Sequence, residues 1–145
     1  MFKHILIATD GSELAQKGVE QGLTLAKTVG AKATAVTVTE PIAAMLVGEV
    51  AIALPLDDYD RAAAADAARI LAGVSASAAK AGVACETLHV KDQYPAEGIV
   101  EVAKARGCDL IVMASHGRRG LSKLLLGSQA TRVLTLSEVP VLVCR

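Results

Sequence analysis

The residues best suited to hold an anion lie between positions 114 and 128, which read ASHGRRGLSKLLLGS. Gly117 and Gly120 allow a backbone to approach a ligand closely or to adopt a positive φ, because glycine has no Cβ. Gly127 and Ser128 open a predicted helix, where unpaired N–H groups and the helix dipole attract anions and the Ser128 hydroxyl adds a donor. Positive charge accompanies them at Arg118, Arg119 and Lys123.

This segment predicts a phosphate-binding loop, because it combines close backbone approach, cations and a helix N-terminus. The residues alone leave an alternative open, which is an ordinary helix-capping turn that follows a flexible basic loop. His116 lies inside the segment, and we interpret it as a polar residue that holds the loop in shape. His4 and His89 have no partner at a spacing that would suggest a catalytic triad.

A second polar turn, Thr9–Ser12, follows the first apolar run of the chain. The Asp10 carboxylate could accept hydrogen bonds from ribose hydroxyls, or reach a Mg²⁺ ion that bridges phosphates. The alternative is a helix cap by Asp10 or Ser12, with Glu13 in the first turn. The two interpretations are compatible, since the two acceptors need not share a task.

The elements that must position these turns alternate along the chain. Apolar runs predict five strands at Ile5–Ala8, Ala33–Val38, Glu86–Val90, Leu110–Ala114 and Val139–Cys144. Their continuous hydrophobicity is typical of strands buried on both faces of a parallel sheet. Four helical faces lie between them, formed by Ala15, Val19, Leu23 and Ala26; by Ala63, Ala67, Ile70, Leu71, Val74 and Ala78; by Ala96, Ile99, Val100 and Ala103; and by Ala130, Val133, Leu134 and Ser137. Glycines at 30 and 82 are expected to end the first two helices, and a proline at 95 to begin the third.

This β-α-β alternation predicts an α/β fold with a doubly wound parallel sheet, helices on both faces, and ligands bound at the carboxyl ends of the strands. The 145 residues suit one domain, 1–145, without internal repeats. One long connection, Glu40–Asp58, is apolar, which suggests a lid or a packing surface rather than a linker.

Composition excludes several classes of function. Fifteen basic residues balance fifteen acidic ones, which argues against a nucleic-acid-binding protein, and three aromatic residues are too few to stack bases. No apolar stretch is long enough to span a membrane or to act as a signal peptide. The widely spaced Cys85, Cys108 and Cys144 form no metal or redox motif, so we interpret them as buried thiols of a cytoplasmic protein.

These segments together resemble the universal stress protein family over essentially the whole chain. KHILIATDGSE is similar to the first strand and turn of that family, AVTVTEP to its second strand, CDLIVMASHGRRGLSKLLLGS to its nucleotide loop and VPVLVCR to its last strand. The nucleotide-binding members carry G-x2-G-x9-G-[ST], which here reads Ala114-x2-Gly117-x9-Gly127-Ser128. The resemblance implies a Rossmann-like sheet of the adenine nucleotide alpha hydrolase type, with strand order 3-2-1-4-5.

The resemblance also implies a binding site for ATP, with Mg²⁺, or for AMP. Asp10 would face the ribose or the metal, and the backbone of Val38 would read the edge of the adenine. Met113 and Ala8 would line the adenine pocket, and the phosphates would be held by Gly117, Gly127, Ser128 and the Gln129 amide. Ala114 departs from the family pattern, yet it ends a predicted strand with ordinary β dihedrals, where a small side chain can replace glycine.

Other functions stay open at this point. An ATP-using enzyme of related architecture would carry SGG-x-DS or H-x-G-H, and a phosphoacceptor domain would need a lysine after the last strand; the chain has none of these. Slow ATP hydrolysis, or self-phosphorylation at Ser128 or Ser122, would be a secondary activity. A family member that binds no nucleotide would act only as a dimeric interaction module. We expect a homodimer through the final strand, Val139–Cys144, because an edge strand offers open backbone groups.

Overall fold

The computed structural model describes residues 1–45, 55–118 and 125–145. Within these residues the strands are β1 (His4–Ala8), β2 (Lys32–Val38), β3 (Cys85–Val90), β4 (Leu110–Ala114) and β5 (Val141–Cys144). The helices are α1 (Glu13–Val29), α2 (Ile42–Met45), α3 (Leu56–Ala81), α4 (Pro95–Arg106) and α5 (Ser128–Leu136). Among the described residues, no helix combines the length and hydropathy needed to cross a membrane.

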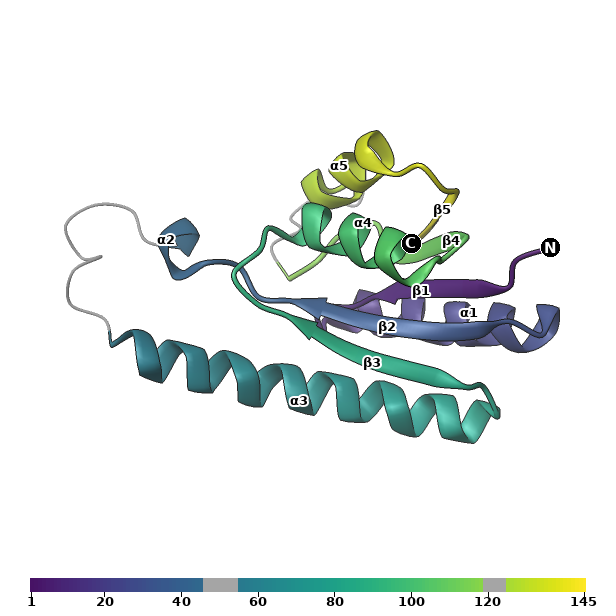
Figure 1. Cartoon of the computed structure of the whole chain (residues 1–145), viewed down its shortest axis with the longest axis horizontal. Helices are drawn as coiled ribbons and strands as arrows, with labels where there is room; N and C mark the ends of the chain where they lie inside the picture. Colours follow the sequence, from purple (N-terminus) through teal and green to yellow (C-terminus); the bar gives the residue numbers. More distant parts are fainter. Residues whose placement is uncertain (46–54, 119–124) are drawn as a thin grey trace.

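All the strands pair in parallel in the order β3-β2-β1-β4-β5, which confirms the predicted doubly wound sheet and strand order. Helices α1 and α3 cover one face of the sheet, and α4 and α5 cover the other (Figure 1). The chain leaves β1 toward β2 on one side, while β4 pairs with β1 on the other. The carboxyl ends of β1 and β4 therefore mark the switch point, where a cleft forms.

Two apolar clusters hold the layers together, one on each face of the sheet. Ile5 and Ile7 of β1 pack with α1 and α3, whereas Leu6 and Ala8 of the same strand pack with α4 and α5. The central strands β1 and β4 are buried throughout, as their continuous hydrophobicity predicted. This burial fixes the positions of the turns that follow both strands.

Helix ends agree with the sequence signals. The Ser12 hydroxyl accepts a hydrogen bond from the N–H of Ala15 (3.2 Å), so Ser12 is the N-cap of α1. Gly30 and Gly82 end α1 and α3 with φ values of 70° and 73°, which a residue with a Cβ rarely adopts. Pro95 begins α4, where its missing N–H costs nothing.

Three expectations about strand bounds and burial are wrong. The last strand begins at Val141 rather than at Val139, because the Ser137 hydroxyl bonds the N–H and the carbonyl of Val139 in a local turn. Strand β3 is only half-buried, because it lies at an edge of the sheet. Leu134 is 45% exposed, since the nine-residue α5 buries only Ala130 and Val133.

Parts of two predicted features lie outside the described residues. The connection Glu40–Asp58 is described only as far as α2 and from position 55 onward, so its proposed role as a lid is not addressed. Of the basic loop, Arg119, Gly120, Ser122 and Lys123 also lie outside.

Candidate functional site

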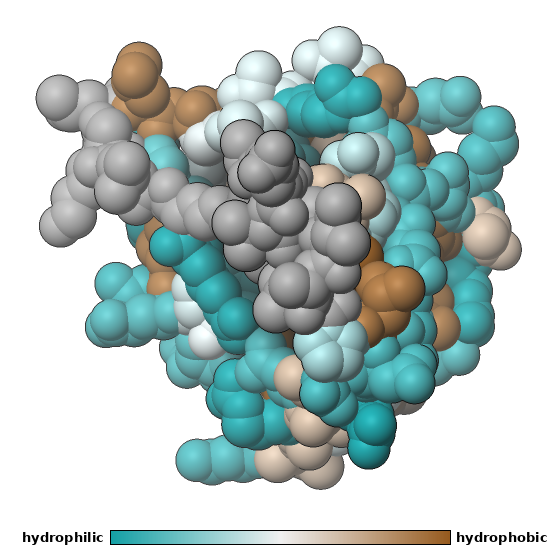
Figure 2. All heavy atoms as spheres, turned by 90° about the vertical axis from the view of Figure 1, so that its left-hand side faces the viewer, coloured by the Kyte–Doolittle hydropathy of each residue, from teal (hydrophilic) through white to brown (hydrophobic). Residues whose placement is uncertain are grey.

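A cavity of about 670 Å³ opens at the carboxyl ends of the strands, at the switch point of the sheet. Figure 2 looks onto this end of the molecule, where hydrophobic side chains are exposed within a mostly hydrophilic surface. The predicted site residues all line this cavity: Ala8, Asp10, Val38, Met113, Ala114, Gly117, Gly127, Ser128 and Gln129. The fold thus brings together residues from four separate segments of the chain.

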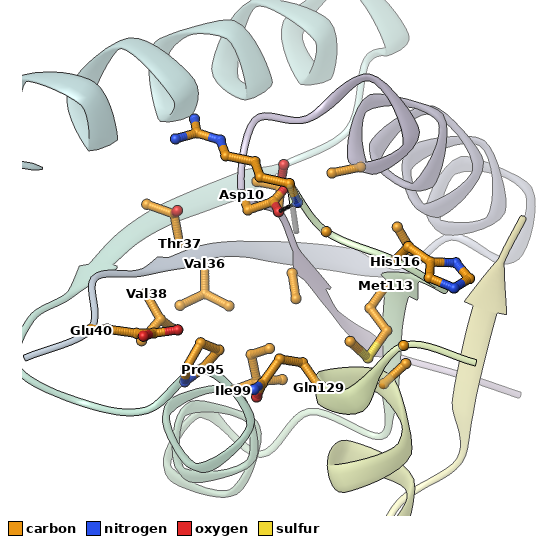
Figure 3. A pocket seen from close by; sticks show the side chains of 18 of the residues that line it. Asp10, Val36, Thr37, Val38, Glu40, Pro95, Ile99, Met113, His116 and Gln129 are labelled. Atoms are coloured by element: carbon orange, nitrogen blue, oxygen red, sulfur yellow. Dashed lines mark hydrogen bonds between the residues drawn. The ribbon is translucent and has the colours of Figure 1, made fainter. Parts of the chain in front are cut away.

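One side of the cavity is apolar. Val36 and Val38 of β2 point toward Pro95 and Ile99 of α4, and Met113 of β4 lies beside them (Figure 3). These residues form a slot between the sheet and α4 that would accept a flat apolar ring. Aliphatic groups rather than aromatic rings therefore make its walls.

The backbone of Val38 faces this slot with polar groups. On the β3 side, the carbonyls of Ala84 and Val90 accept the N–H groups of Ala33 and Thr39. On the β1 side, the Val36 carbonyl accepts the N–H of Thr9. Because parallel strands alternate their bonding directions, both the N–H and the carbonyl of Val38 also face the β1 side. Strand β1 has already ended there, and no backbone partner for Val38 is present among the described residues. An adenine edge, which has an acceptor beside a donor, matches this pair of groups.

Asp10 ties the two turns at the switch point together. Its Oδ1 accepts a hydrogen bond from the N–H of Ser12 (2.9 Å), and its Oδ2 accepts one from the N–H of Arg118 (2.8 Å). The predicted helix cap is therefore Ser12, whereas Asp10 holds the loop after β4, and the proposed contact of Asp10 with ribose or Mg²⁺ stays a prediction. A Cβ at Gly117 would lie 2.5 Å from Asp10 Oδ2, so glycine at this position permits close approach of the carboxylate and does not serve a positive φ.

The N-terminus of α5 is open toward the cavity. Its N-cap, Gly127, has no side chain to accept a hydrogen bond from the first turn. The first helical backbone bond among the described residues is donated by Thr131 to the Gly127 carbonyl. The N–H groups of Ser128, Gln129 and Ala130 precede it and have no intrahelical acceptor. This arrangement suits an anion.

Gln129 and Ser128 differ in their side-chain contacts. The Gln129 Oε1 accepts a hydrogen bond from the N–H of Ala96 (3.2 Å) and so joins the first turns of α4 and α5. The Ser128 hydroxyl makes no hydrogen bond to an imidazole or a carboxylate in the described part of the chain.

Ala114 ends β4 with an ordinary negative φ and pairs with Cys144 of β5. The expectation that this position does not require glycine for its backbone conformation is confirmed.

Sequence reasoning missed the wall that α3 contributes. The cavity-lining residues of this helix are Tyr59, Ala63, Asp66, Ala67 and Ile70. Their helical spacing predicted a buried face for the alanines and Ile70, but no signal separated core contact from cavity lining. Thr37 was also missed; it is 5% exposed and lines the cavity.

A charged pair crosses from the loop to α3. Arg118 Nη2 donates a hydrogen bond to Asp66 Oδ2 (3.2 Å), and Arg69 Nη2 donates one to Asp66 Oδ1 (2.6 Å). Hydrogen bonds from Arg69 and the charge of Arg118 hold the pKa of Asp66 below its ordinary value. Asp66 is therefore ionised and held by two guanidinium groups.

His116 contacts a neighbouring side chain, and two of the three cysteines are buried. The His116 Nδ1 lies 3.0 Å from the Ser115 hydroxyl, and its ring points away from Val36 and Val38 (Figure 3). Burial raises the pKa of Cys108 to about 11 and also raises that of Cys144, which suits inert thiols. Cys85 is only half-buried, because it begins the edge strand β3, so the expectation of three buried thiols is wrong there.

No group of three or more metal-ligating His, Cys, Asp or Glu side chains occurs among the described residues. Asp10, at the carboxyl end of β1, would offer a carboxylate near bound phosphates. Mg²⁺ commonly binds through one or two carboxylates together with substrate phosphates and water, so this donor set fits a metal that arrives with the nucleotide.

The profile of the universal stress protein family matches residues 1–145. The chain belongs to the universal stress protein family. The universal stress protein YxiE of Bacillus subtilis is 32% identical to it, and the alignment covers 100% of both chains. A solved structure of the Methanocaldococcus jannaschii protein MJ0577 superposes with a TM-score of 0.83 at 26% identity, covering 99% of this chain and 96% of that one.

A more distant universal stress protein, solved in complex with cAMP, shares the fold. Its TM-score is 0.72 at 24% identity, with 98% of this chain and 95% of that chain covered. The architecture found here is therefore that of the universal stress protein fold as a whole.

Proposed function

We propose that this universal stress protein binds an adenine nucleotide, ATP or AMP, and acts in a stress response or in signalling with little or no catalysis. The observation that carries the proposal is the arrangement of two polar groups across one apolar slot. The free backbone edge of Val38 lies at one end, and the open N-terminus of α5 lies near the other. In an adenine nucleotide, the polar edge of the base would match the Val38 backbone, and the phosphate would match the N-terminus of α5.

Each part of a nucleotide has a candidate contact. The adenine would lie between Val36, Ile99 and Met113, with its polar edge on the Val38 backbone. The phosphates would accept hydrogen bonds from the N–H groups of Ser128 and Gln129. The ribose would lie between these contacts, near Asp10. Support comes from the cAMP complex of a protein with the same fold.

The charges that line the cavity support binding of Mg²⁺ together with ATP. The described lining residues include the carboxylates of Asp10, Glu40 and Asp66 but only one guanidinium, that of Arg118. A triphosphate there would lie near these carboxylates, and Mg²⁺ would offset the added negative charge. We therefore expect ATP to bind as its magnesium complex.

We also infer that two copies associate through β5, which lies at an edge of the sheet. The carbonyls of Pro140 and Cys144 accept hydrogen bonds from β4, so the polar backbone groups of Val141 and Val143 face outward. A second β5 could pair with these groups. The proposed interface is thus Val141–Cys144 and excludes the predicted Val139 and Pro140. We place the protein in the cytoplasm, where its free thiols would stay reduced.

Isothermal titration calorimetry with ATP, AMP and GTP, each with and without Mg²⁺, tests the proposed function. We expect both adenine nucleotides to bind and GTP to bind at least about tenfold more weakly. The guanine edge reverses the donor and acceptor that would face Val38, and an unpaired buried polar group costs about 1–3 kcal/mol. Absence of any adenine-nucleotide binding near millimolar concentration would refute the proposal. Equal binding of GTP would refute the assignment of Val38.

A further inference from the structure

The side chains of Asp66 and Arg118 form a contact that is separate from the one holding the backbone of Arg118. The loop after β4 is already held by the main-chain hydrogen bond from Arg118 to Asp10 (2.8 Å). The guanidinium extends further and reaches Asp66 on α3. The backbone of Arg118 is thus anchored independently of its side chain.

The side-chain contact is easily exchanged. The side chains of Arg118 and Asp66 are 50% and 38% exposed, and exposed ion pairs of this kind are weak. Asp66 also keeps a shorter hydrogen bond to Arg69 (2.6 Å), so it stays paired if Arg118 leaves. The Asp66 carboxylate therefore keeps a cationic partner when Arg118 is released.

Arg118 is also the only Lys or Arg among the described residues that line the cavity. A monophosphate at the N-terminus of α5 has N–H donors close by. The further phosphates of a triphosphate would need additional donors, and Arg118 lines the same cavity. An arginine suits that task, because its planar guanidinium matches phosphate oxygens.

We propose that Asp66 and Arg118 set the preference of the site between nucleoside monophosphates and triphosphates. Arg118 binds Asp66 when no terminal phosphates are present and exchanges that partner for the terminal phosphates of ATP. Asp66 thus competes with ATP for one guanidinium and competes little with AMP. This inference rests on the proposed nucleotide binding and assigns a specificity role to a residue of α3.

The test is a double-mutant cycle measured by calorimetry with ATP, AMP and adenosine. The variants are Asp66→Asn, Arg118→Gln and the double substitution, and Asp58→Asn is the matched control. Asp58 has the same charge on the same helix, and it does not line the cavity. Thermal melting of each variant checks that it remains folded.

We expect Asp66→Asn to tighten ATP binding about two- to fivefold, the factor that corresponds to loss of a weak ion-pair competitor. AMP affinity should change by less than about twofold, and adenosine affinity should stay the same, because neither ligand presents terminal phosphates. Arg118→Gln should weaken ATP binding and remove the effect of Asp66→Asn. Asp58→Asn should leave all three affinities unchanged.

Two results would overturn the inference while leaving the proposed function intact. If Asp66→Asn leaves or lowers the ATP affinity of a chain that binds ATP, Asp66 does not compete for Arg118. If Asp66→Asn tightens ATP binding equally in the Arg118→Gln background, the effect is simple repulsion across space. If the unaltered chain binds none of the three ligands, the proposed function fails first and the inference fails with it.

Discussion

Replacing Gly127 by alanine probes the contact that positions the α5 N-terminus. The added Cβ would lie 2.5 Å from the carbonyl oxygen of Ser115 and 3.4 Å from the Cα of His116. The Gly127 N–H also donates a hydrogen bond to that same carbonyl (2.8 Å). Both opposing atoms belong to the backbone, so no side-chain rotation can relieve the overlap.

The size of the effect follows from this distance. Ordinary contact begins at 3.4 Å, so the two backbone segments must separate by 3.4 − 2.5 = 0.9 Å along that line. Overpacking of this kind costs about 1–3 kcal/mol of unfolding free energy. For a domain of this size the melting temperature should fall by about 3–10 °C. The same movement displaces the N–H groups of α5, and hydrogen bonds to charged groups contribute about 1.5–3 kcal/mol each. We therefore expect ATP and AMP affinity to fall at least about tenfold.

Calorimetry and thermal melting measure the two effects separately, and Gly73→Ala is the control. Gly73 lies within α3, and an added Cβ there meets no atom within 4 Å. That substitution should raise stability by up to about 1 kcal/mol and leave nucleotide affinity unchanged. The reasoning is refuted if Gly127→Ala stays folded and binds ATP within about twofold of the unaltered chain.

Two further predictions concern stability and assembly. Burial, followed by the charge of Lys32, lowers the pKa of His4, whose ring bonds Thr34 (2.8 Å). The unfolded chain therefore takes up this proton more readily, and the associated stability is present above pH 6.5 and lost as the pH falls through 6.5 toward the lowered pKa. Melting temperatures should decline below pH 6.5 and decline less in His4→Gln; equal declines would show that His4 is not responsible. Leu142→Glu, at a 39% exposed position of β5, should shift a dimer toward monomer in sedimentation velocity, whereas Leu56→Glu on α3 should not. A Leu142→Glu protein that stays dimeric would place the interface elsewhere.

The fold could be predicted from the sequence because its signals are local. Short apolar runs defined every strand, and the glycines at 30 and 82 ended two helices by their backbone freedom alone. The start of β5 was missed because a side-chain turn at Ser137 precedes it, and no periodicity reports such a turn. Leu134 was misplaced because a short helix buries a narrower face than its hydrophobic pattern suggests.

The candidate site was predictable where residues follow strand ends and not where a helix crosses them. Asp10 and Gly127 directly follow, or pack beside, the ends of central strands, so topology alone brings them together. Asp66 lies 52 residues before its partner Arg118, and nothing in the spacing indicates that pair. Thr37 was missed for a different reason, because a threonine within a strand is usually interpreted as a core residue and not as a residue that lines a cavity.

The most direct test of the account is an NMR titration of the ¹⁵N-labelled chain with AMP and with ATP and Mg²⁺. The amide signals of Val38 and of the first turn of α5, Ser128 to Ala130, should shift most, because their N–H groups are the proposed donors. The amides of His4 and Lys32, at the amino ends of β1 and β2 and so at the opposite end of the strands, should not move. Shifts that leave Val38 and Ser128 unchanged, or that cluster at the amino ends of the strands, would contradict the proposed site.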